Sequence, residues 1–364
     1  MVNNHEYYIR ECFKLALNAK GQTSPNPYVG AIIVKEDQII AKGYHAKAGL
    51  PHAEADAFNN ATESVVGATL YCNLEPCCHT DKRTPPCAQR IIQEGIKEVI
   101  ICNLDPNPKV AGMGVKLLQE AGIKVTTGVL EEEGLLLNEV FFHHILTKTP
   151  FIHLKWAQTL DGKMATKLNH SKWITSSVAR EYVHKERQLY DAILVGANTA
   201  NIDNPSLSIR LNENEEFKSR IIITKSGNLK TELKVLSDTA KSNTIVIIPP
   251  DVEFHSKKVK ILKCPLAGPF FDMDIMLKGL YDLGIYSLYI EGGPLTLTHF
   301  IKQNNYNRIS VYTAPKLMGT GSNSLGELEI TQMSEVITLS HAKWQVLGPD
   351  MLMESRRNIC LQDL

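Results

Sequence analysis

Short apolar runs of strand length alternate with helical patterns along most of this 364-residue chain. In the first half, the apolar runs predict strands at 29–34, 69–72, 99–102 and 124–129. Patterns with helical spacing lie around these runs, at 5–19, 52–60, 86–94 and 115–121. The alternation predicts a mixed sheet covered by helices, which is an α/β fold.

A breaker at Thr147-Lys148-Thr149-Pro150 precedes a second alternation of the same kind. Before it, 131–146 carries apolar residues at helical spacing and is expected to close the first domain. After it, we expect strands at 151–156, 192–195, 221–224, 244–248, 287–290 and 309–313, and helices at 177–187, 273–283 and 295–303. The prediction is two domains, 1–146 and 150–364, which suits domains of about 150 residues each.

Charge and hydropathy exclude several classes of protein. Lys plus Arg and Asp plus Glu both number 39, so no net field would hold nucleic acid or an anionic membrane. No apolar run approaches the roughly 18 residues of a spanning helix, and the first ten residues do not resemble a secretory signal. We therefore expect a cytoplasmic protein without nucleic-acid or membrane partners, whose eight cysteines stay reduced.

The strongest local signal is His52-Ala53-Glu54, followed by Pro76-Cys77 and later by Cys87. One imidazole and two thiolates suit a tetrahedral Zn²⁺ whose fourth position stays open to water, which is how catalytic zinc is held. A carboxylate two residues from the histidine ligand can move the protons, as in zinc nucleobase deaminases. The pattern predicts a hydrolase with one zinc ion per chain and Glu54 as its acid/base.

Two other interpretations stay open at this point. His52 and Glu54 could begin an ordinary helix while the two cysteines pack as small apolar side chains. Alternatively, Cys78 or His79 could supply a fourth ligand and close the site, giving a zinc-stabilised binding module without turnover. The order and spacing of all four residues together favour the hydrolase.

Five motifs in the first 115 residues carry a family resemblance. They are Thr23-x-Pro25-Asn26-Pro27-x-Val29-Gly30, Gly43-x-His45-x₃-Gly49-x-Pro51-His52-Ala53-Glu54, Leu74-Glu75-Pro76-Cys77-x-His79, Thr84-Pro85-Pro86-Cys87 and Asp105-Pro106-Asn107-Pro108. Together they resemble the deaminase half of the bifunctional deaminase/reductase family of riboflavin biosynthesis.

This resemblance implies a cytidine-deaminase-like α/β/α sandwich with zinc on His52, Cys77 and Cys87. The implied substrate is 2,5-diamino-6-(5-phosphoribosylamino)pyrimidin-4-one, which would lose an amine to water. The residues expected to face this substrate are Asn26, His45, His79 and Lys82. The ten positions from Cys77 to Cys87 exceed the family's usual spacing by one, so either Lys82 or Arg83 would meet the phosphate.

The second half lacks a Gly-x-Gly-x-x-Gly fingerprint between a strand and a helix. Its one candidate phosphate cradle is Glu291-Gly292-Gly293-Pro294-Leu295-Thr296, where an apolar strand ends and a helix is expected to begin. The same residues also fit a tight connection that binds nothing.

A second set of motifs resembles the reductase half of the same family. They are Phe151-x₃-Lys155, Leu160-Asp161-Gly162-Lys163, Ser171-x-Trp173-Ile174-Thr175-Ser176, Ala179-Arg180, Arg187, Asp191-Ala192-Ile193-Leu194, Thr199, Asp203-Asn204-Pro205-x-Leu207, Arg210 and Glu291-Gly292-Gly293. The resemblance implies a dihydrofolate-reductase-like α/β domain that uses NADPH to reduce the ribosyl group of 5-amino-6-(5-phosphoribosylamino)uracil to the ribityl form.

By the same resemblance, the expected cofactor contacts are Ala157, Trp173, Thr199, Asp203, Gly293, Pro294, Leu295 and Thr296. The expected substrate contacts are Ser171, Arg187, Leu207, Arg210 and Glu291, with Glu291 as proton source or orienting group. Without the resemblance, Arg187 fits a surface salt bridge, Arg210 a solvated charge and Trp173 a buried ring.

We predict a bifunctional enzyme acting on a phosphorylated pyrimidine, and a homo-oligomer. The rival enzyme is a tRNA or mononucleotide deaminase with an unrelated appended domain.

Overall fold

The computed structural model describes residues 4–78, 86–107, 110–211, 214–237 and 243–357. Its internal contacts divide the chain into two compact units, the first ending at Thr147 and the second beginning at Lys148. None of the helices in these ranges is both long and apolar enough to cross a membrane.

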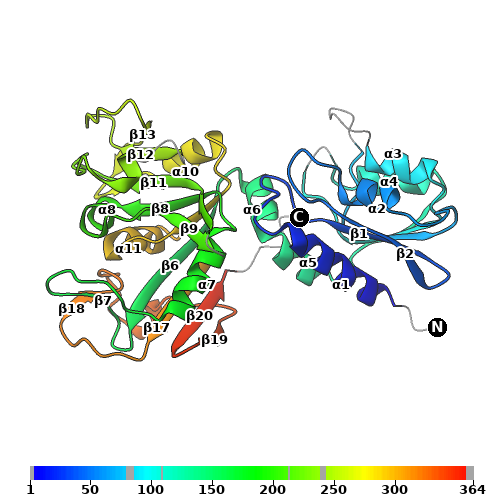
Figure 1. The fold of residues 1–364 in the computed structure, drawn as a ribbon. Coiled ribbons are helices and arrows are strands. Elements are labelled where there is room, and N and C mark those ends of the chain that lie inside the picture. Colours follow the sequence, from blue (N-terminus) through cyan, green and yellow to red (C-terminus); the bar gives the residue numbers. More distant parts are fainter. Residues whose placement is uncertain (1–3, 79–85, 108–109, 212–213, 238–242, 358–364) are drawn as a thin grey trace. The chain divides into compact units, whose positions relative to one another are not determined.

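The first unit is built on a five-stranded sheet with the order β2-β1-β3-β4-β5 (Figure 1). The strands are β1 (Gly30–Lys35), β2 (Gln38–Tyr44), β3 (Thr69–Leu74), β4 (Glu98–Asn103) and β5 (Lys124–Thr126). β1 runs antiparallel to β2 and β3, whereas β3, β4 and β5 are parallel. The unit is therefore a mixed sheet.

Helices cover both faces of this sheet because its strands are apolar on both sides. On β1, Ile32 and Val34 pack with α1 (His5–Ala16), which a short 3₁₀ turn extends through Leu17–Ala19. The alternate residues Ala31 and Ile33 belong to the core of the opposite face. The helices of that opposite face are α2 (Ala53–Asn59), α3 (Cys87–Gln93) and α4 (Met113–Glu120). The α/β/α sandwich expected from the resemblance is confirmed.

Two elements of this unit differ from the sequence prediction. β2 was not expected; it pairs with β1 across a tight turn in which Glu36 and Asp37 both have positive φ. The helix expected over 131–146 is two helices, α5 (Glu131–Leu137) and α6 (Glu139–Thr147). The interruption falls at Asn138, whose side chain bonds to the backbone of Tyr28.

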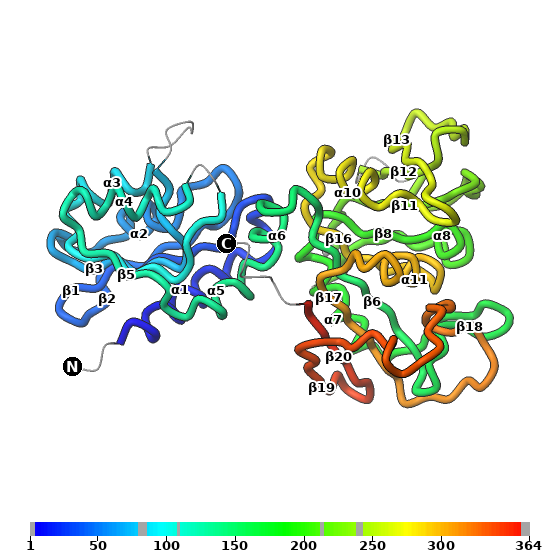
Figure 2. Tube along the Cα trace, turned by 180° about the vertical axis from the view of Figure 1, so that it is seen from behind, coloured from blue at the N-terminus to red at the C-terminus, as the bar shows by residue number. Residues whose placement is uncertain are grey.

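The second unit contains a nine-stranded sheet with the order β13-β12-β11-β8-β16-β6-β17-β20-β19, whose path Figure 2 lets the reader follow. Its strands are β6 (Phe151–Thr159), β8 (Ala192–Gly196), β11 (Ser219–Ile223), β12 (Thr244–Ile248), β13 (Lys260–Lys263), β16 (Ser287–Ile290), β17 (Arg308–Ala314), β19 (Lys343–Leu347) and β20 (Asp350–Arg356). The strands from β13 to β17 are parallel, and β20 and β19 are antiparallel additions at one edge.

Two cores sandwich this sheet, which explains why its central strands read as continuous apolar runs. On β8, Leu194 belongs to the core that contains α10 (Met273–Asp282) and α11 (Pro294–Lys302). Its neighbours Ile193 and Val195 belong to the core that contains α8 (Ala197–Asp203) and α9 (Lys234–Ser237). The α/β fold expected for this half is confirmed.

Smaller elements complete the second unit. α7 (Ser177–Arg187) begins at Ser176, whose hydroxyl accepts a hydrogen bond from the Ala179 N–H. The short strands are β7 (Lys163–Thr166) with β18 (Gly321–Asn323), β9 (Ser208–Leu211) with β10 (Asn214–Phe217), and β14 (Leu266–Ala267) with β15 (Phe270–Phe271). A 3₁₀ turn spans Met333–Glu335.

Candidate active sites

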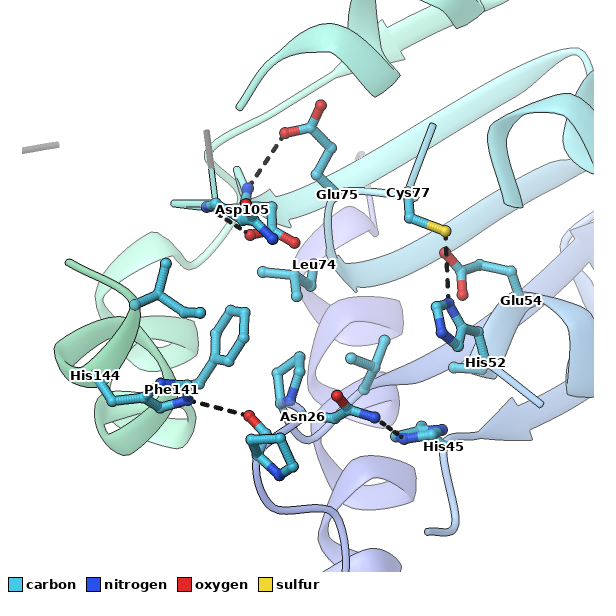
Figure 3. A pocket seen from close by; sticks show the side chains of 16 residues that line it. Asn26, His45, His52, Glu54, Leu74, Glu75, Cys77, Asp105, Phe141 and His144 are labelled. Carbon is cyan, nitrogen blue, oxygen red and sulfur yellow. Dashed lines mark hydrogen bonds between the residues drawn. The ribbon is translucent and has the colours of Figure 1, made fainter. Parts of the chain in front are cut away.

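The three residues predicted as zinc ligands meet at one point of the first unit. His52 immediately precedes α2, Cys77 follows β3, and Cys87 opens α3. The His52 Nδ1 lies 3.6 Å from the Cys77 Sγ (Figure 3). It lies 3.4 Å from the Cys87 Sγ. All three ligand atoms fall within 4.8 Å of one another, and the described residues contain no other such group of His, Cys, Asp and Glu.

This donor set fits zinc. One nitrogen and two sulfurs are the ligands that Zn²⁺ prefers, and three protein ligands leave a fourth tetrahedral position for another molecule. Hydrogen bonding from the Cys87 thiol lowers the pKa of Cys77, and the Cys87 backbone N–H, 3.5 Å away, also donates to the Cys77 sulfur. The site therefore favours at least one thiolate, which is the form that binds metal.

Glu54 lies beside this group, in the first turn of α2. Its side chain is buried and lines a cavity that also reaches His52 and Cys77. Burial raises the pKa of Glu54, because the ionised carboxylate loses solvation. A carboxyl group with a raised pKa next to a metal-binding group is suited to proton transfer.

Close backbone packing places Glu54 there. A Cβ atom added at Gly43 of β2 would lie 2.2 Å from the Ala57 nitrogen and 2.4 Å from the Ala53 oxygen of α2. Only glycine lets the strand and the helix approach this closely.

The cavity has a volume of about 230 Å³, and both substrate contacts expected here among the described residues line it. The His45 Nδ1 donates a hydrogen bond to the Pro51 oxygen at 3.0 Å, so its Nε2 accepts one from the Asn26 Nδ2 at 3.1 Å. This bond fixes the Asn26 amide and leaves its oxygen on the cavity side (Figure 3). His79, Lys82 and Arg83 lie outside the described residues.

Three further cavity residues had no role in the sequence analysis. Phe141 and His144 come from α6, and the buried Glu75 follows β3. The Glu75 carboxylate accepts hydrogen bonds from the backbone N–H groups of Asp105, Gly112 and Val115, and it thereby joins the loop after β4 to the start of α4. Glu75 lay in a recognised motif, but no local signal pointed to α6.

A second cavity, of about 340 Å³, lies in the second unit. It is lined by eight of the residues expected to bind cofactor or substrate, Ala157, Ser171, Trp173, Arg187, Asp203, Leu207, Arg210 and Glu291. The structure therefore brings together side chains from β6, the loop before α7, α7 itself, the end of α8, the start of β9 and the residue after β16.

A largely buried ion-pair group lines this second cavity. Arg187 donates two hydrogen bonds to Glu291, at 2.5 and 2.9 Å, and the Lys155 Nζ lies 3.8 Å from the same carboxylate. Burial opposes ionisation of Glu291, but Arg187 and Lys155 outweigh it and hold its pKa at about 2. Glu291 was expected to be a proton source or an orienting group, and an ionised carboxylate fits the orienting role. The salt bridge of Arg187 does not lie at the surface, because its side chain is only 14% exposed.

Thr199 and the turn at 293–296 do not line this cavity, but they lie next to each other. A Cβ atom added at Gly293 would lie 3.1 Å from the Thr199 Oγ1, and one at Gly292 would lie 2.6 Å from the Thr296 Cβ. Gly293 precedes α11, which follows β16, while Thr199 lies in α8 after the neighbouring parallel strand β8. Such carboxyl ends of parallel strands are where α/β sheets bind nucleotides, so this cradle fits NADPH phosphates.

Trp173 is not the buried ring that its residue type alone suggested. Its side chain is 63% exposed, and the Arg180 guanidinium lies 4.4 Å from the ring centre. Nearby, the Ser171 hydroxyl donates a hydrogen bond to Asp203 at 2.9 Å. An exposed aromatic ring at a cavity rim is available to stack on a ligand.

Comparisons with known proteins agree with this architecture. Residues 2–103 match the family described as the cytidine and deoxycytidylate deaminase zinc-binding region, and residues 150–353 match the RibD C-terminal domain. The riboflavin biosynthesis protein RibD of Aquifex aeolicus is 45% identical over 96% of this chain and 98% of that protein. RibD of Escherichia coli is 34% identical over 96% of this chain and 98% of its own length.

Solved structures give the same result. A Thermotoga maritima protein described as a diaminohydroxyphosphoribosylaminopyrimidine deaminase/5-amino-6-(5-phosphoribosylamino)uracil reductase is 35% identical, with a TM-score of 0.88 over 97% of this chain and 99% of that chain. RibD of Acinetobacter baumannii is 31% identical, with a TM-score of 0.88 over 98% of this chain and 100% of its own. The rival interpretation, in which the second domain is unrelated to the first, is therefore wrong.

Proposed function

Because this chain belongs to the RibD family of riboflavin biosynthesis proteins, we propose that its two units act in turn on one phosphorylated pyrimidine. The chain is a bifunctional deaminase and reductase that uses zinc and NADPH. In this proposal, the first unit deaminates 2,5-diamino-6-(5-phosphoribosylamino)pyrimidin-4-one. The second unit reduces the ribosyl group of the resulting 5-amino-6-(5-phosphoribosylamino)uracil to the ribityl form.

The observation that carries the deaminase assignment is the convergence of His52, Cys77 and Cys87 beside the buried Glu54. Zinc held by these three residues would activate a water molecule for attack on the ring. The Glu54 carboxylate would take a proton from that water and return it to the leaving amine, which a raised pKa assists. Asn26, held by His45, would present its amide oxygen to a ring N–H group.

In the reductase unit, bound NADPH would supply a hydride to C1′ of the phosphoribosylamino group, the C1′–O4′ bond of the ribose would break, and O4′ would take up a proton. Arg210 would bind the ribose phosphate, because a guanidinium group can donate two hydrogen bonds to one phosphate. Arg187, whose guanidinium is held by Glu291 and the Ser208 oxygen, would add positive charge and its remaining N–H groups. We assign proton delivery to the largely buried Lys155–Glu291 pair, in which the ammonium carries the proton. Burial lowers the pKa of Lys155, which eases its release of a proton.

The remaining contacts of this proposal follow the resemblance. Cofactor contacts would come from Ala157, Trp173, Thr199, Asp203 and the cradle at 293–296, and further substrate contacts from Ser171, Leu207, His79 and Lys82. A homo-oligomer and a cytoplasmic location also stay predictions; a reducing compartment suits two thiolate ligands.

The direct test supplies purified, zinc-loaded chain with the diaminopyrimidine ribotide and NADPH. We expect ammonia release followed by NADPH oxidation. Ammonia release without NADPH oxidation would overturn the reductase assignment. If NADPH is oxidised when the deaminated substrate is supplied, but not when the diaminopyrimidine ribotide is supplied, the deaminase assignment is overturned. If the chain binds zinc but catalyses neither reaction, the alternative of a zinc-stabilised binding module without turnover is supported.

A further inference from the structure

We infer that Asn138 and His144 are positioning residues for deamination, which hold the segment that carries Asn26. The inference rests on the deaminase function proposed above and extends it to α5 and α6. These helices lie outside residues 2–103, which match the zinc-binding deaminase region.

The Asn26 segment, residues 23–30, needs support from outside itself. Pro25 and Pro27 lack backbone N–H groups, so this segment cannot pair like a regular strand before β1 begins at Gly30. The backbone-to-backbone hydrogen bonds of this segment include a turn from the Asn26 N–H to the Thr23 oxygen and a bond from the His45 N–H to the Val29 oxygen.

Asn138 holds this segment on the carboxyl side of Asn26. Its Oδ1 accepts a hydrogen bond from the Tyr28 N–H at 2.8 Å, and its Nδ2 donates to the Tyr28 oxygen at 3.0 Å. One buried amide, 3% exposed, thus bonds both backbone groups of Tyr28, and the Tyr28 oxygen also accepts a hydrogen bond from the Asn73 Nδ2 at 2.9 Å. Asn138 can reach them because it stands at the break between α5 and α6.

His144 holds the segment on the amino side of Asn26. Its Nε2 donates a hydrogen bond to the Pro25 oxygen at 3.1 Å, and its buried ring packs edge-on against Phe141 at 5.6 Å between ring centres. Figure 3 shows this bond at the side of the cavity opposite His45. Asn26 is therefore fixed by bonds to the residue before it, to Tyr28 two residues after it, and to its own side chain.

The geometry points to a direct consequence for substrate binding. If either backbone contact is lost, the Asn26 amide no longer meets His45 in one orientation, and its oxygen is not presented to the pyrimidine. A contact made equally to substrate and transition state changes KM rather than kcat. Loss of His144 or Asn138 should therefore raise KM for the diaminopyrimidine ribotide while the zinc ligands and Glu54 stay in place.

The test compares H144F, which keeps a ring but removes the donor, with H144Q, whose amide nitrogen can still donate to Pro25. We expect H144F to raise the deaminase KM about tenfold with kcat within about threefold, and H144Q to recover most of that loss. H143F is the matched control, because His143 is the adjacent residue of α6 and does not line the cavity. Zinc content and the reductase activity of the same chain report folding.

A double-mutant cycle with N26A decides whether His144 acts through Asn26. We expect H144F to cost less than about twofold in the N26A background, because the oriented amide is already gone. Hydrogen–deuterium exchange of a peptide covering 20–30 should also rise in H144F with full zinc content. N138A, which removes the second contact, is the independent variant if H144F does not fold.

An equal penalty from H144F with and without Asn26 would overturn the inference, as would an H144Q variant no better than H144F. If the unmodified, zinc-loaded chain releases no ammonia, the proposed function is overturned instead. Hydrogen–deuterium exchange of residues 20–30 would still show whether H144F loses the backbone contact.

Discussion

Two largely buried carboxyl groups, one in each unit, illustrate how surroundings decide protonation. Glu54 is buried beside a metal-binding group, and desolvation raises its pKa. Glu291 is also desolvated, but the paired Arg187 and the nearby Lys155 hold its pKa at about 2. The first is suited to carry a proton and the second to stay charged, although both are glutamates.

Replacement of Glu54 by glutamine should abolish deamination selectively. The amide keeps the size of the side chain but cannot accept and return a proton, so we expect ammonia release to fall by roughly 10²- to 10⁴-fold. Zinc content, measured by atomic absorption, and the reductase rate should match those of the unmodified chain. A Glu54→Gln variant that still releases ammonia at the full rate would show that another group moves the proton.

Glu291 should make the second unit sensitive to acid. Because its pKa falls from 4.5 unfolded to about 2 folded, its ionised form stabilises the unit above about pH 4.5, and this stability is lost as pH falls toward 2. The loss is on the order of 3 kcal/mol. Glu291→Gln should be less stable at pH 7 but should lose less between pH 4.5 and 2.5, measured by urea unfolding.

Tryptophan fluorescence isolates that measurement. The three tryptophans, at 156, 173 and 344, all belong to the second unit. An identical pH dependence in the variant and the unmodified chain would assign the acid sensitivity to other groups.

Motifs allowed individual residues to be predicted only where their roles are local in sequence. His52, Cys77 and Cys87 stand in motifs whose spacing suits a metal, and the structure brings them together. Asn138 and His144 bond to backbone atoms more than a hundred positions away, and no spacing encodes such a contact. Residue type alone favoured a buried ring for Trp173, whereas the resemblance predicted a cofactor contact; the ring is exposed and lies against Arg180.

At the scale of elements, the approach of β2 to α2 sets the position of Glu54. Gly43→Ala would put a methyl group 2.2 Å from the Ala57 nitrogen, so α2 must move away from the strand. We expect roughly a tenfold or greater loss of zinc affinity, together with about 1–3 kcal/mol of stability. Zinc retained after dialysis against a buffered zinc concentration measures the first effect.

Lys42→Ala is the control for this change, because Lys42 is an exposed neighbour on the same strand. Equal zinc retention in both variants would mean that α2 tolerates the displacement.

Apolar periodicity predicted the elements that bury a continuous face and failed where other forces decide. The strands β3, β12 and β16 lie where their apolar runs predicted them. The break at Asn138 was missed because apolar spacing continues across it, while the interruption comes from bonds to Tyr28. α8 was missed because Asn, Thr and Asp are weak helix formers, and its stability comes from packing of Ala200 in the core.

At the scale of the whole molecule, each unit encloses its own cores and its own cavity. The three proposed zinc ligands all belong to the first unit, so removal of zinc with 1,10-phenanthroline should stop ammonia release and leave NADPH oxidation with the deaminated substrate unchanged. Added zinc should restore ammonia release. Parallel loss of both activities would show that the second unit depends on the metal.

The helices that follow β5 also have a practical consequence for anyone who borrows this catalytic scaffold. A fragment that ends at Asn103 would contain the expected zinc ligands and Glu54. It would lack α6, which lines the cavity, and it would lose the hydrogen bonds that hold residues 23–30 in place. Such a chimera should capture zinc yet discriminate poorly among pyrimidines. The smallest transplantable piece therefore extends to Thr147.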